Sequence, residues 1–374
     1  MSHAVIVGFL RSPFTPAHKG ALAQTRPDDI ATQVVQALVK ATGVNPDHID
    51  DLIMGCAFPE GEQGFNIGRM VALQAGLPQS VAGQTVNRWC GSSMEAIHIA
   101  AGNIASGKGE VFIAAGVESM TRIPMGGYNP LPNPALYKSL PEAYISMGLT
   151  AENVAKQCNV SREAQEDFAL NSHKKAAAAD LSGEIVPITT KAGVVDRDGT
   201  IRAGSTRDDL AKLNPAFDVY GTVTAGTSSP LTDGAAAVLV VSEAYAKKHG
   251  LKPLAKIKTM AVVGLDPKVM GLGPVYAVNK ALEKAGLKIS DIDIAEINEA
   301  FSAQAIPCGQ QLGIPPEKLN IEGGAIALGH PLGASGARIT GKAALLLSRS
   351  KGKYAISAAC IGGGMGIATV LERA

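Results

Sequence analysis

One stretch of the sequence organises the rest of the chain: Asn87-Arg88-Trp89-Cys90-Gly91-Ser92-Ser93-Met94. A β-compatible run, Gln84–Val86, precedes it, and a good helix-forming run, Met94–Ala101, follows it. Cys90 is therefore predicted at a strand-to-helix turn, where free backbone N–H groups and the helix dipole favour a thiolate. Gly91 lets another chain or a substrate come close to the sulfur. The alternative interpretation is a buried and inert cysteine.

The composition is that of a globular protein. The 374 residues suffice for two or three domains, with 46% hydrophobic and 18% charged residues. The 42 glycines and the aromatic content of only 4% favour a close-packed α/β structure with many tight turns. A formal net charge of +1 gives no electrostatic footprint for nucleic acid or a membrane surface, so neither partner is expected.

Cysteine usage indicates a reducing compartment. The five cysteines are an odd number and no pair has C-x-x-C spacing, so neither a disulfide framework nor a zinc site is expected. Residues 1–8 run straight into a predicted strand, without the basic and apolar regions of a signal peptide. No stretch is long and apolar enough to span a bilayer. We therefore expect a cytoplasmic protein.

Alternating strands and helices predict an α/β protein. Continuous apolar runs such as Leu52–Gly55 and Val111–Gly116 indicate strands that are buried on both faces, and helical runs such as Ile30–Lys40 separate them. Such strands belong to parallel sheets with helices on both sides. Met120–Ala143 lacks a clear period and is interpreted as a long functional loop.

The second part of the chain repeats the first. The helical run Ala37–Ala41 is followed by a glycine turn and a strand, and Ala281–Ala285 is followed by the same pattern. Two similar halves are the economical explanation, and chance similarity of short units is the alternative. The predicted division is an N-terminal half over residues 1–119 continued by 232–252, an inserted domain over 120–231, and a C-terminal half over 253–374.

Three stretches of the second half place reactive groups at strand ends or glycine turns. Asn298 follows an apolar strand, where α/β sheets present functional groups. His330 lies in the glycine-rich run 323–336 and precedes a proline, which favours an extended backbone. Cys360 also follows an apolar strand and faces Gly362–Gly366, whose backbone N–H groups could bind an oxyanion.

Two cysteines, one histidine and one asparagine make a coherent site. One cysteine would be the nucleophile with the histidine as its base, and the other would move a proton with a pKa lowered toward neutrality. The structural alternatives are a turn asparagine and a core histidine. The glycines after Cys360 are not a dinucleotide site, because the strand-like run Ile367–Leu371 follows them instead of a helix. No metal and no redox cofactor are expected.

Four motifs stand in a fixed order along the chain. They are Cys90-Gly91-Ser92-Ser93, Asn298-Glu299-Ala300-Phe301, Gly329-His330-Pro331 and Cys360-Ile361-Gly362-Gly363-Gly364-Met365-Gly366. Together they resemble the motifs of the thiolases, a family of acetyl-CoA C-acyltransferases, and the resemblance covers nearly the whole chain. It implies a fold of two similar βαβαβαββ halves in five αβαβα layers, with a loop domain inserted in the first half.

The resemblance also implies a role for each residue of the site. Cys90 would be the acylated nucleophile, His330 its base, and Cys360 the acid/base that acts on the acetyl-CoA carbon and on incoming CoA. His330 and a water held by Asn298 would form one oxyanion hole. The backbone N–H groups of Cys90 and Gly362 would form a second. The residues implied to contact CoA or to line its pantetheine tunnel are Ser229, Met147, Phe217, Met270 and Phe301, with CoA as a substrate and no cofactor.

The resemblance is closer to degradative 3-ketoacyl-CoA thiolases than to biosynthetic acetoacetyl-CoA thiolases. Ser93 stands where biosynthetic members more often carry glycine, and Ser146 where they commonly carry histidine. The expected reaction is thiolytic cleavage of 3-ketoacyl-CoA to acyl-CoA and acetyl-CoA, and the alternative is condensation of two acetyl-CoA. The short segment between Ser119 and Met147 favours a homodimer over a homotetramer, or association with other β-oxidation enzymes of lipid metabolism.

Two further alternatives conflict with the motifs. A ketosynthase would carry a histidine or asparagine in place of Cys360. A catalytically silent acyl-CoA carrier would not need the intact set of two cysteines, histidine and asparagine. The apolar and aromatic segment 120–145 is expected to cover acyl chains longer than acetoacetyl, or else to pack the inserted domain or a subunit interface.

Overall fold

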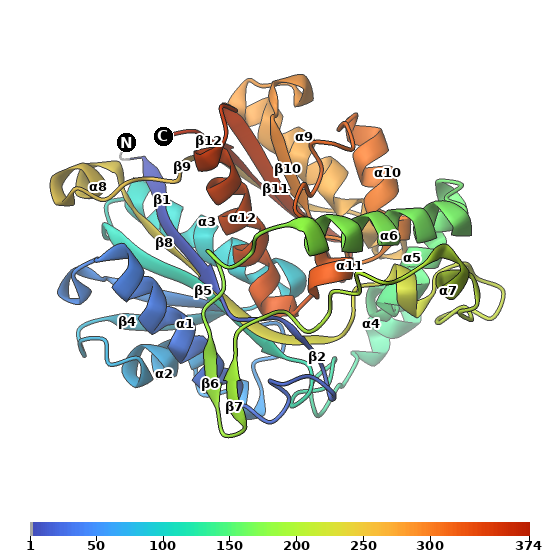
Figure 1. Cartoon of the computed structure of the whole chain (residues 1–374), viewed down its shortest axis with the longest axis horizontal. Coiled ribbons are helices and arrows are strands. Elements are labelled where there is room, and N and C mark those ends of the chain that lie inside the picture. Colours follow the sequence, from blue (N-terminus) through green and yellow to red (C-terminus); the bar gives the residue numbers. More distant parts are fainter. Residues whose placement is uncertain (1–2) are drawn as a thin grey trace.

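The computed structural model describes residues 3–374, and the chain forms two halves of the same construction (Figure 1). The first half runs β1 (Ala4–Arg11), α1 (Pro27–Thr42), β3 (Asp51–Gly55), α2 (Ile67–Gln74), β4 (Ala82–Val86), α3 (Ser92–Ala105), β5 (Val111–Ser119) and β8 (Thr232–Ser242). The second half runs β9 (Ala255–Gly264), α9 (Gly273–Ala285), β10 (Ile294–Ile297), α10 (Ser302–Leu312), α12 (Leu332–Arg349), β11 (Tyr354–Ile361) and β12 (Met365–Glu372). The predicted duplication is confirmed.

The strands of both halves join into one sheet in the order β4-β3-β5-β8-β1-β9-β12-β11-β10. Two residue pairs connect the halves, Val5 with Lys256 and Ile6 with Ala255. The sheet is mixed: β3 is parallel to β4 and β5, and β10 is parallel to β11, but the remaining pairings along this order are antiparallel. The sequence predicted a parallel sheet, and the difference arises in part because β11 and β12 form a hairpin, which must be antiparallel.

Three apolar clusters pack five layers together. The first cluster packs α1 and α2 against the outer face of the first half's sheet. The second lies between the two halves, where α3 and α12 are covered by strands from both. The third packs α9 and α10 against the outer face of the second half's sheet. Helix α12 therefore lies near the centre of the molecule (Figure 1), and the order of layers is αβαβα.

The segment between β5 and β8 carries its own short elements. These are α4 (Pro134–Ser139), α5 (Met147–Gln157), α6 (Arg162–Ala178), β6 (Ile188–Thr190), β7 (Gly193–Val195) and α7 (Arg207–Ala211). Helix α4 lies within the stretch that the sequence predicted to be irregular. The Asn133 side chain accepts hydrogen bonds from the N–H groups of Ala135 and Leu136, and Pro134 occupies the first turn, so local capping favours this helix.

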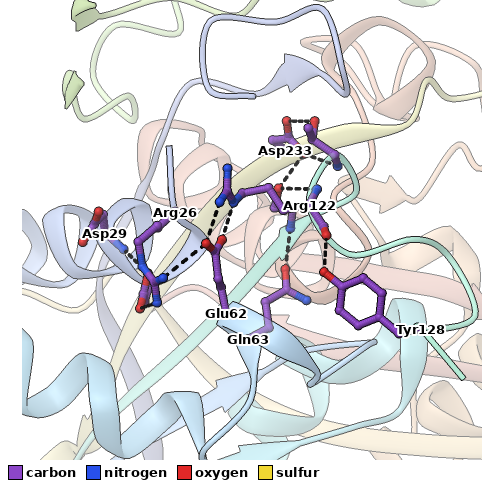
Figure 2. A network of polar contacts seen from close by, with 10 residues as sticks. Arg26, Asp29, Glu62, Gln63, Arg122, Tyr128 and Asp233 are labelled. Atoms are coloured by element: carbon purple, nitrogen blue, oxygen red, sulfur yellow. Dashed lines mark hydrogen bonds and ion pairs between the residues drawn. The ribbon is translucent and has the colours of Figure 1, made fainter. Parts of the chain in front are cut away.

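A polar network ties the beginning of this segment to the first half (Figure 2). Glu62 forms ion pairs with Arg26 and Arg122. The Gln63 side-chain oxygen accepts a hydrogen bond of 2.6 Å from the N–H of the last residue of β5. Asp233, at the start of β8, accepts one of 2.9 Å from the N–H of residue 121. The chain that leaves β5 is thus fixed to the neighbouring strand.

The two ends of the sheet differ. At one end, β10 is covered by the segment around Asn320. The Ala295 N–H donates to the Lys318 carbonyl, the Asn320 N–H donates to the Ala295 carbonyl, and the Asn320 side chain bonds both the N–H and the carbonyl of Ile297. At the other end, β4 has no strand beyond it among residues 3–374. Within the same residues, no helix has the length and apolarity needed to cross a membrane.

Candidate active site

Cys90 lies in a tight turn, Trp89–Gly91, that leads directly into α3, as the sequence predicts. Trp89 has a φ of +40°, in the left-handed region that bulky residues rarely occupy. Its N–H donates to the Asn87 side-chain oxygen at 2.9 Å, and the Arg88 N–H donates to the Ser92 hydroxyl at 2.9 Å. These bonds stabilise the strained turn that holds the sulfur of Cys90 at the helix start.

His330 lies in the corresponding turn before α12. Its backbone N–H donates to the Thr232 hydroxyl at 3.0 Å. Nδ1 of the ring lies 2.6 Å from the Ser335 hydroxyl, and Nε2 lies 3.2 Å from Nδ2 of Asn298. The imidazole is therefore held by a polar contact at each nitrogen.

Close packing of α3 on α12 brings the two turns together. A Cβ atom at Gly336 would collide with the backbone of Met94 in α3, and one at Gly333 would collide with the carbonyl oxygen of Val117 in the neighbouring strand β5. The hydroxyl of Ser93 accepts a hydrogen bond of 2.8 Å from the Ala337 N–H. As a result, Cys90 shares a small apolar cluster with Leu332, two residues after His330.

The third part of the site is the hairpin between β11 and β12. Cys360 is buried and pairs with Gly366 across the hairpin. Gly363 and Gly364 form the turn with φ of +73° and +80°, a conformation that favours glycine. The turn directs the Gly362 N–H toward the sulfur of Cys90, where it and the N–H of Cys90 itself favour a negative charge. Such a pair of backbone donors is suited to an oxyanion.

Asn298 follows β10 directly and is completely buried. Its N–H donates to the Ala358 carbonyl at 2.9 Å, which fixes the residue beside β11. While Nδ2 faces His330, Oδ1 has no partner within the protein. A buried acceptor of this kind requires a partner such as water or a substrate.

Burial shifts the pKa of each ionisable group of the site in the direction that favours its neutral form. It raises the pKa of Cys90 to about 11, although the N–H groups of Gly362 and Cys90 oppose the effect. It also raises the pKa of Cys360 well above that of an ordinary thiol. Burial, reinforced by the charge of Arg338, lowers the pKa of His330 to about 3. The expected thiolate and the expected near-neutral second cysteine are therefore wrong, because desolvation penalises the charged forms. The resting site holds neutral thiols and a neutral imidazole.

Comparison with known proteins agrees with this geometry. The family model described as the thiolase N-terminal domain matches residues 4–244, and the thiolase C-terminal domain matches residues 251–373. The chain belongs to the thiolase family. Relatives named 3-ketoacyl-CoA thiolase include one from Bacillus subtilis (strain 168), 46% identical with full coverage of both chains. One from Saccharophagus degradans is 46% identical over 99% of this chain and 98% of its own, and one from Colwellia psychrerythraea is 47% identical with full coverage of both chains.

In this thiolase the five predicted CoA-contacting residues lie in or around the apolar cluster that contains Cys360. Met270 and Phe301 share its apolar cluster, and Met147 packs against that cluster. The Phe217 ring meets the Phe301 ring edge-on at 5.8 Å. The fifth residue, Ser229, donates its N–H to the Ala300 carbonyl at 2.9 Å. The inserted segment is therefore joined to the residues that follow Asn298.

Sequence reasoning missed three residues that hold this thiolase site together. Ser335 and Thr232 are the partners of His330 described above. Glu118, at the end of β5, is buried and accepts hydrogen bonds from Gln63 at 2.7 Å and from the Gly333 N–H at 2.9 Å. Only Glu118 gave a signal, since it ends an apolar strand. Residues 3–374 of this thiolase contain no cluster of three or more His, Cys, Asp or Glu side chains that could hold a metal.

Proposed function

We propose that this thiolase cleaves 3-ketoacyl-CoA with CoA to give acyl-CoA and acetyl-CoA through an acyl-Cys90 intermediate. One observation carries the proposal: a neutral thiol at the start of α3 and a neutral imidazole at the start of α12, with Cys360 on the adjoining hairpin. The names of the relatives support the same direction of reaction.

The first half-reaction forms the acyl-enzyme. Nε2 of His330 accepts the proton of Cys90 while the sulfur attacks the 3-keto carbon, whose oxygen receives the electron pair. The N–H groups of Cys90 and Gly362 stabilise this oxyanion. When the oxyanion collapses, the bond between the second and third carbons breaks, and the acetyl-CoA enolate leaves with its oxygen near His330 and Asn298. Cys360 gives the enolate carbon its proton.

The second half-reaction returns the enzyme to its resting state. The Cys360 thiolate takes the proton of an incoming CoA thiol, and the CoA sulfur attacks the acyl group on Cys90. The bond between the acyl carbon and Cys90 breaks, and His330 returns the proton to the Cys90 sulfur. Each group ends in the protonation state in which it began, so the site needs neither metal nor redox cofactor. Loss of activity with EDTA, restored by one specific metal, would contradict this.

We further propose that residues 120–231 form the CoA-binding domain, inserted between residues 1–119 and 232–252 of the first half and followed by the second half over 253–374. Met147, Phe217, Met270 and Phe301 would line the pantetheine tunnel. The Ser229 backbone bond to Ala300 supports this arrangement, because it places the inserted segment beside the motif that contains Asn298.

The substrate length is tested with a ladder of 3-ketoacyl-CoA thioesters. The segment 120–145 carries exposed apolar side chains, Met125, Leu131 and Tyr137 among them, which support a cover for longer chains. Each buried methylene contributes about 0.8 kcal/mol, so we expect kcat/KM for thiolysis of 3-ketohexanoyl- and 3-ketodecanoyl-CoA to exceed that for acetoacetyl-CoA. If acetoacetyl-CoA is better by tenfold or more, the enzyme belongs instead with the biosynthetic condensing thiolases.

We also propose that this thiolase forms a homodimer through the β4 end of the sheet. Beside α2, which packs against β4, a groove of about 600 Å³ is lined by exposed Phe65 and Met70 together with Arg26 and Glu62. Apolar groups and charges of both signs on one surface suit a second copy of the same surface.

The homodimer is tested by sedimentation. Phe65 is 92% exposed, and Phe65→Asp should produce monomers. Tyr220 is 95% exposed and lies in the inserted segment, so Tyr220→Asp is the matched control that should keep the dimer. A wild-type tetramer, or equal behaviour of both variants, would oppose the proposal. Association with other β-oxidation enzymes would be detected by co-purification from the native cells.

A cytoplasmic location completes the proposal. All five cysteines are free, and four of them are buried, which suits a reducing compartment. Cell fractionation that places the protein in an oxidising compartment would contradict this location.

A further inference from the structure

The partners of the His330 ring have hydrogen-bonding roles that chemistry fixes. On one side, Nδ2 of Asn298 lies 3.2 Å from Nε2, and in this orientation of the amide the nitrogen donates, so Nε2 offers its lone pair. On the other side, the Ser335 oxygen lies 2.6 Å from Nδ1. The same oxygen lies 3.0 Å from the Pro331 carbonyl, which can only accept.

A serine hydroxyl has one proton and two lone pairs. Since the proton of Ser335 is directed to the Pro331 carbonyl, its lone pair accepts from Nδ1–H of His330. A neutral imidazole carries a single proton, and both sides of the ring therefore place it on Nδ1. The two partners belong to distant parts of the chain, yet they require the same tautomer.

We propose that Ser335 is a positioning residue that fixes His330 with its proton on Nδ1 and thereby keeps Nε2 free as the base for Cys90. Ser335 is buried in the first turn of α12 and acts through the imidazole. The inference rests on the proposed role of His330 and adds the residue that determines which ring nitrogen acts.

The hydrogen bond between Ser335 and Nδ1 of His330 also stabilises the protonated ring. When the Cys90 S–H bond breaks and an Nε2–H bond forms, the imidazole becomes a cation that donates from both nitrogens. The Ser335 oxygen accepts from Nδ1–H before and after this transfer, so the contact needs no reorganisation. Arg338, further along α12, disfavours the cation, and an oriented oxygen at Nδ1 opposes that effect.

The kinetic test compares Ser335→Ala and Ser335→Thr with a matched control. Ser357, in β11, is also buried and bonds the Thr340 hydroxyl of α12 at 2.9 Å, and it forms no hydrogen bond with His330, so Ser357→Ala removes a similar buried hydroxyl that contacts the same helix. We expect Ser335→Ala to lower the single-turnover rate of Cys90 acylation about tenfold to a hundredfold with KM little changed. Ser335→Thr should retain most of the rate, and Ser357→Ala all of it.

The structural readout is the tautomer itself, measured by ¹⁵N NMR with labelled histidine, the His330 signals being assigned from their loss in His330→Asn. Wild-type His330 should carry its proton on Nδ1, and Ser335→Ala should populate the Nε2–H form. A wild-type Nε2–H tautomer would overturn the proposal, as would an unchanged acylation rate in Ser335→Ala or equal losses in Ser335→Ala and Ser357→Ala. If Ser335→Ala does not fold, the proposal is tested by the tautomer in the wild-type spectrum and by the acylation rate of Ser335→Thr. The spectrum needs no substrate, so an inactive wild type would contradict the proposed function alone.

Discussion

At the scale of single residues, the sequence predicts which residues are reactive better than it predicts their charge states. Cys90, Asn298 and Cys360 could be selected because each lies next to a predicted strand or helix end. The charge state of Cys90 could not be predicted, since it depends on burial by segments that are distant in sequence. The contacts of Ser335 and Thr232 with His330 were missed for the same reason: a hydroxyl has no pattern that reveals its partner before the chain is folded.

The neutral resting site predicts an unusual pH dependence for acylation. The pKa of His330 lies at about 3 and that of Cys90 at about 11, so the neutral pair persists through the whole neutral range. The single-turnover rate of Cys90 acylation should therefore stay level from pH 8 down to about 5.5, below the ordinary histidine pKa of about 6.5. Stopped-flow or quenched-flow measurement across this range checks the expectation. A tenfold loss per pH unit that begins near pH 6.5 would show that the imidazole titrates normally.

The two cysteines should fail in different ways. Cys90→Ala should abolish attachment of an acyl group, because the nucleophile is absent. Cys360→Ala should still accept an acyl group on Cys90 but lose about 10²–10⁴-fold in thiolysis, the usual effect of a missing general acid/base. Mass spectrometry of the Cys90 peptide and a thiolysis assay measure the two steps. Acyl label on Cys360 in the wild type would reverse the assignment.

At the scale of elements, the position of the site depends on how closely α3 and α12 approach. The alternation of strands and helices is visible in the sequence, and the glycines of α12 are visible too. The surfaces that these glycines contact in the folded protein cannot be identified from the sequence. The short helix α4 was missed because a single turn capped by Asn133 is too brief to show a period.

Glycine substitutions in the two helices should have opposite effects. Gly336→Ala should destabilise the protein by about 1–3 kcal/mol, because the added methyl collides with the backbone of Met94. Gly102→Ala, in α3, meets no atom within 4 Å and should stabilise by about 0.5–1 kcal/mol through helix propensity. Urea denaturation measures both variants. If they behave alike, the helices are not in close backbone contact.

At the scale of the whole molecule, internal contacts join the two halves across the central layer. His98 on α3 bonds the Thr369 hydroxyl on β12 at 2.9 Å, which links the first half to the second. The repeat that defines the halves could be read from the sequence, because each glycine turn and strand recurs in order. The sequence did not reveal that the repeat is only partial. Where the first half has β4, the second has only the segment around Asn320.

The His98 contact predicts a stability change with pH. Burial lowers the pKa of His98 to about 3, so below the unfolded value of about 6.5 the unfolded chain binds a proton that the folded chain does not. Stability from this group is complete above pH 6.5 and is lost as the pH falls. Relative to His98→Gln, the wild type should lose about 2 kcal/mol of unfolding free energy between pH 7 and pH 5. The comparison with the variant cancels opposing groups such as Glu296, whose pKa burial raises to about 7. A constant difference between the two proteins would mean that His98 titrates alike in both states.

The covered edge of β10 limits how copies of this chain can add to one another. An unpaired strand at each end of a sheet would permit head-to-tail addition, which grows into an open filament. Here the Asn320 side chain occupies the backbone groups of Ile297 at one end of the large sheet, and within residues 3–374 β4 is the end strand of that sheet without a neighbouring strand. Two β4 edges can pair only in an isologous contact, because each copy contributes the same edge. After this pairing neither copy has an unpaired end strand to which a third copy could add. The asymmetry between the duplicated halves therefore favours the closed homodimer proposed above over an open filament.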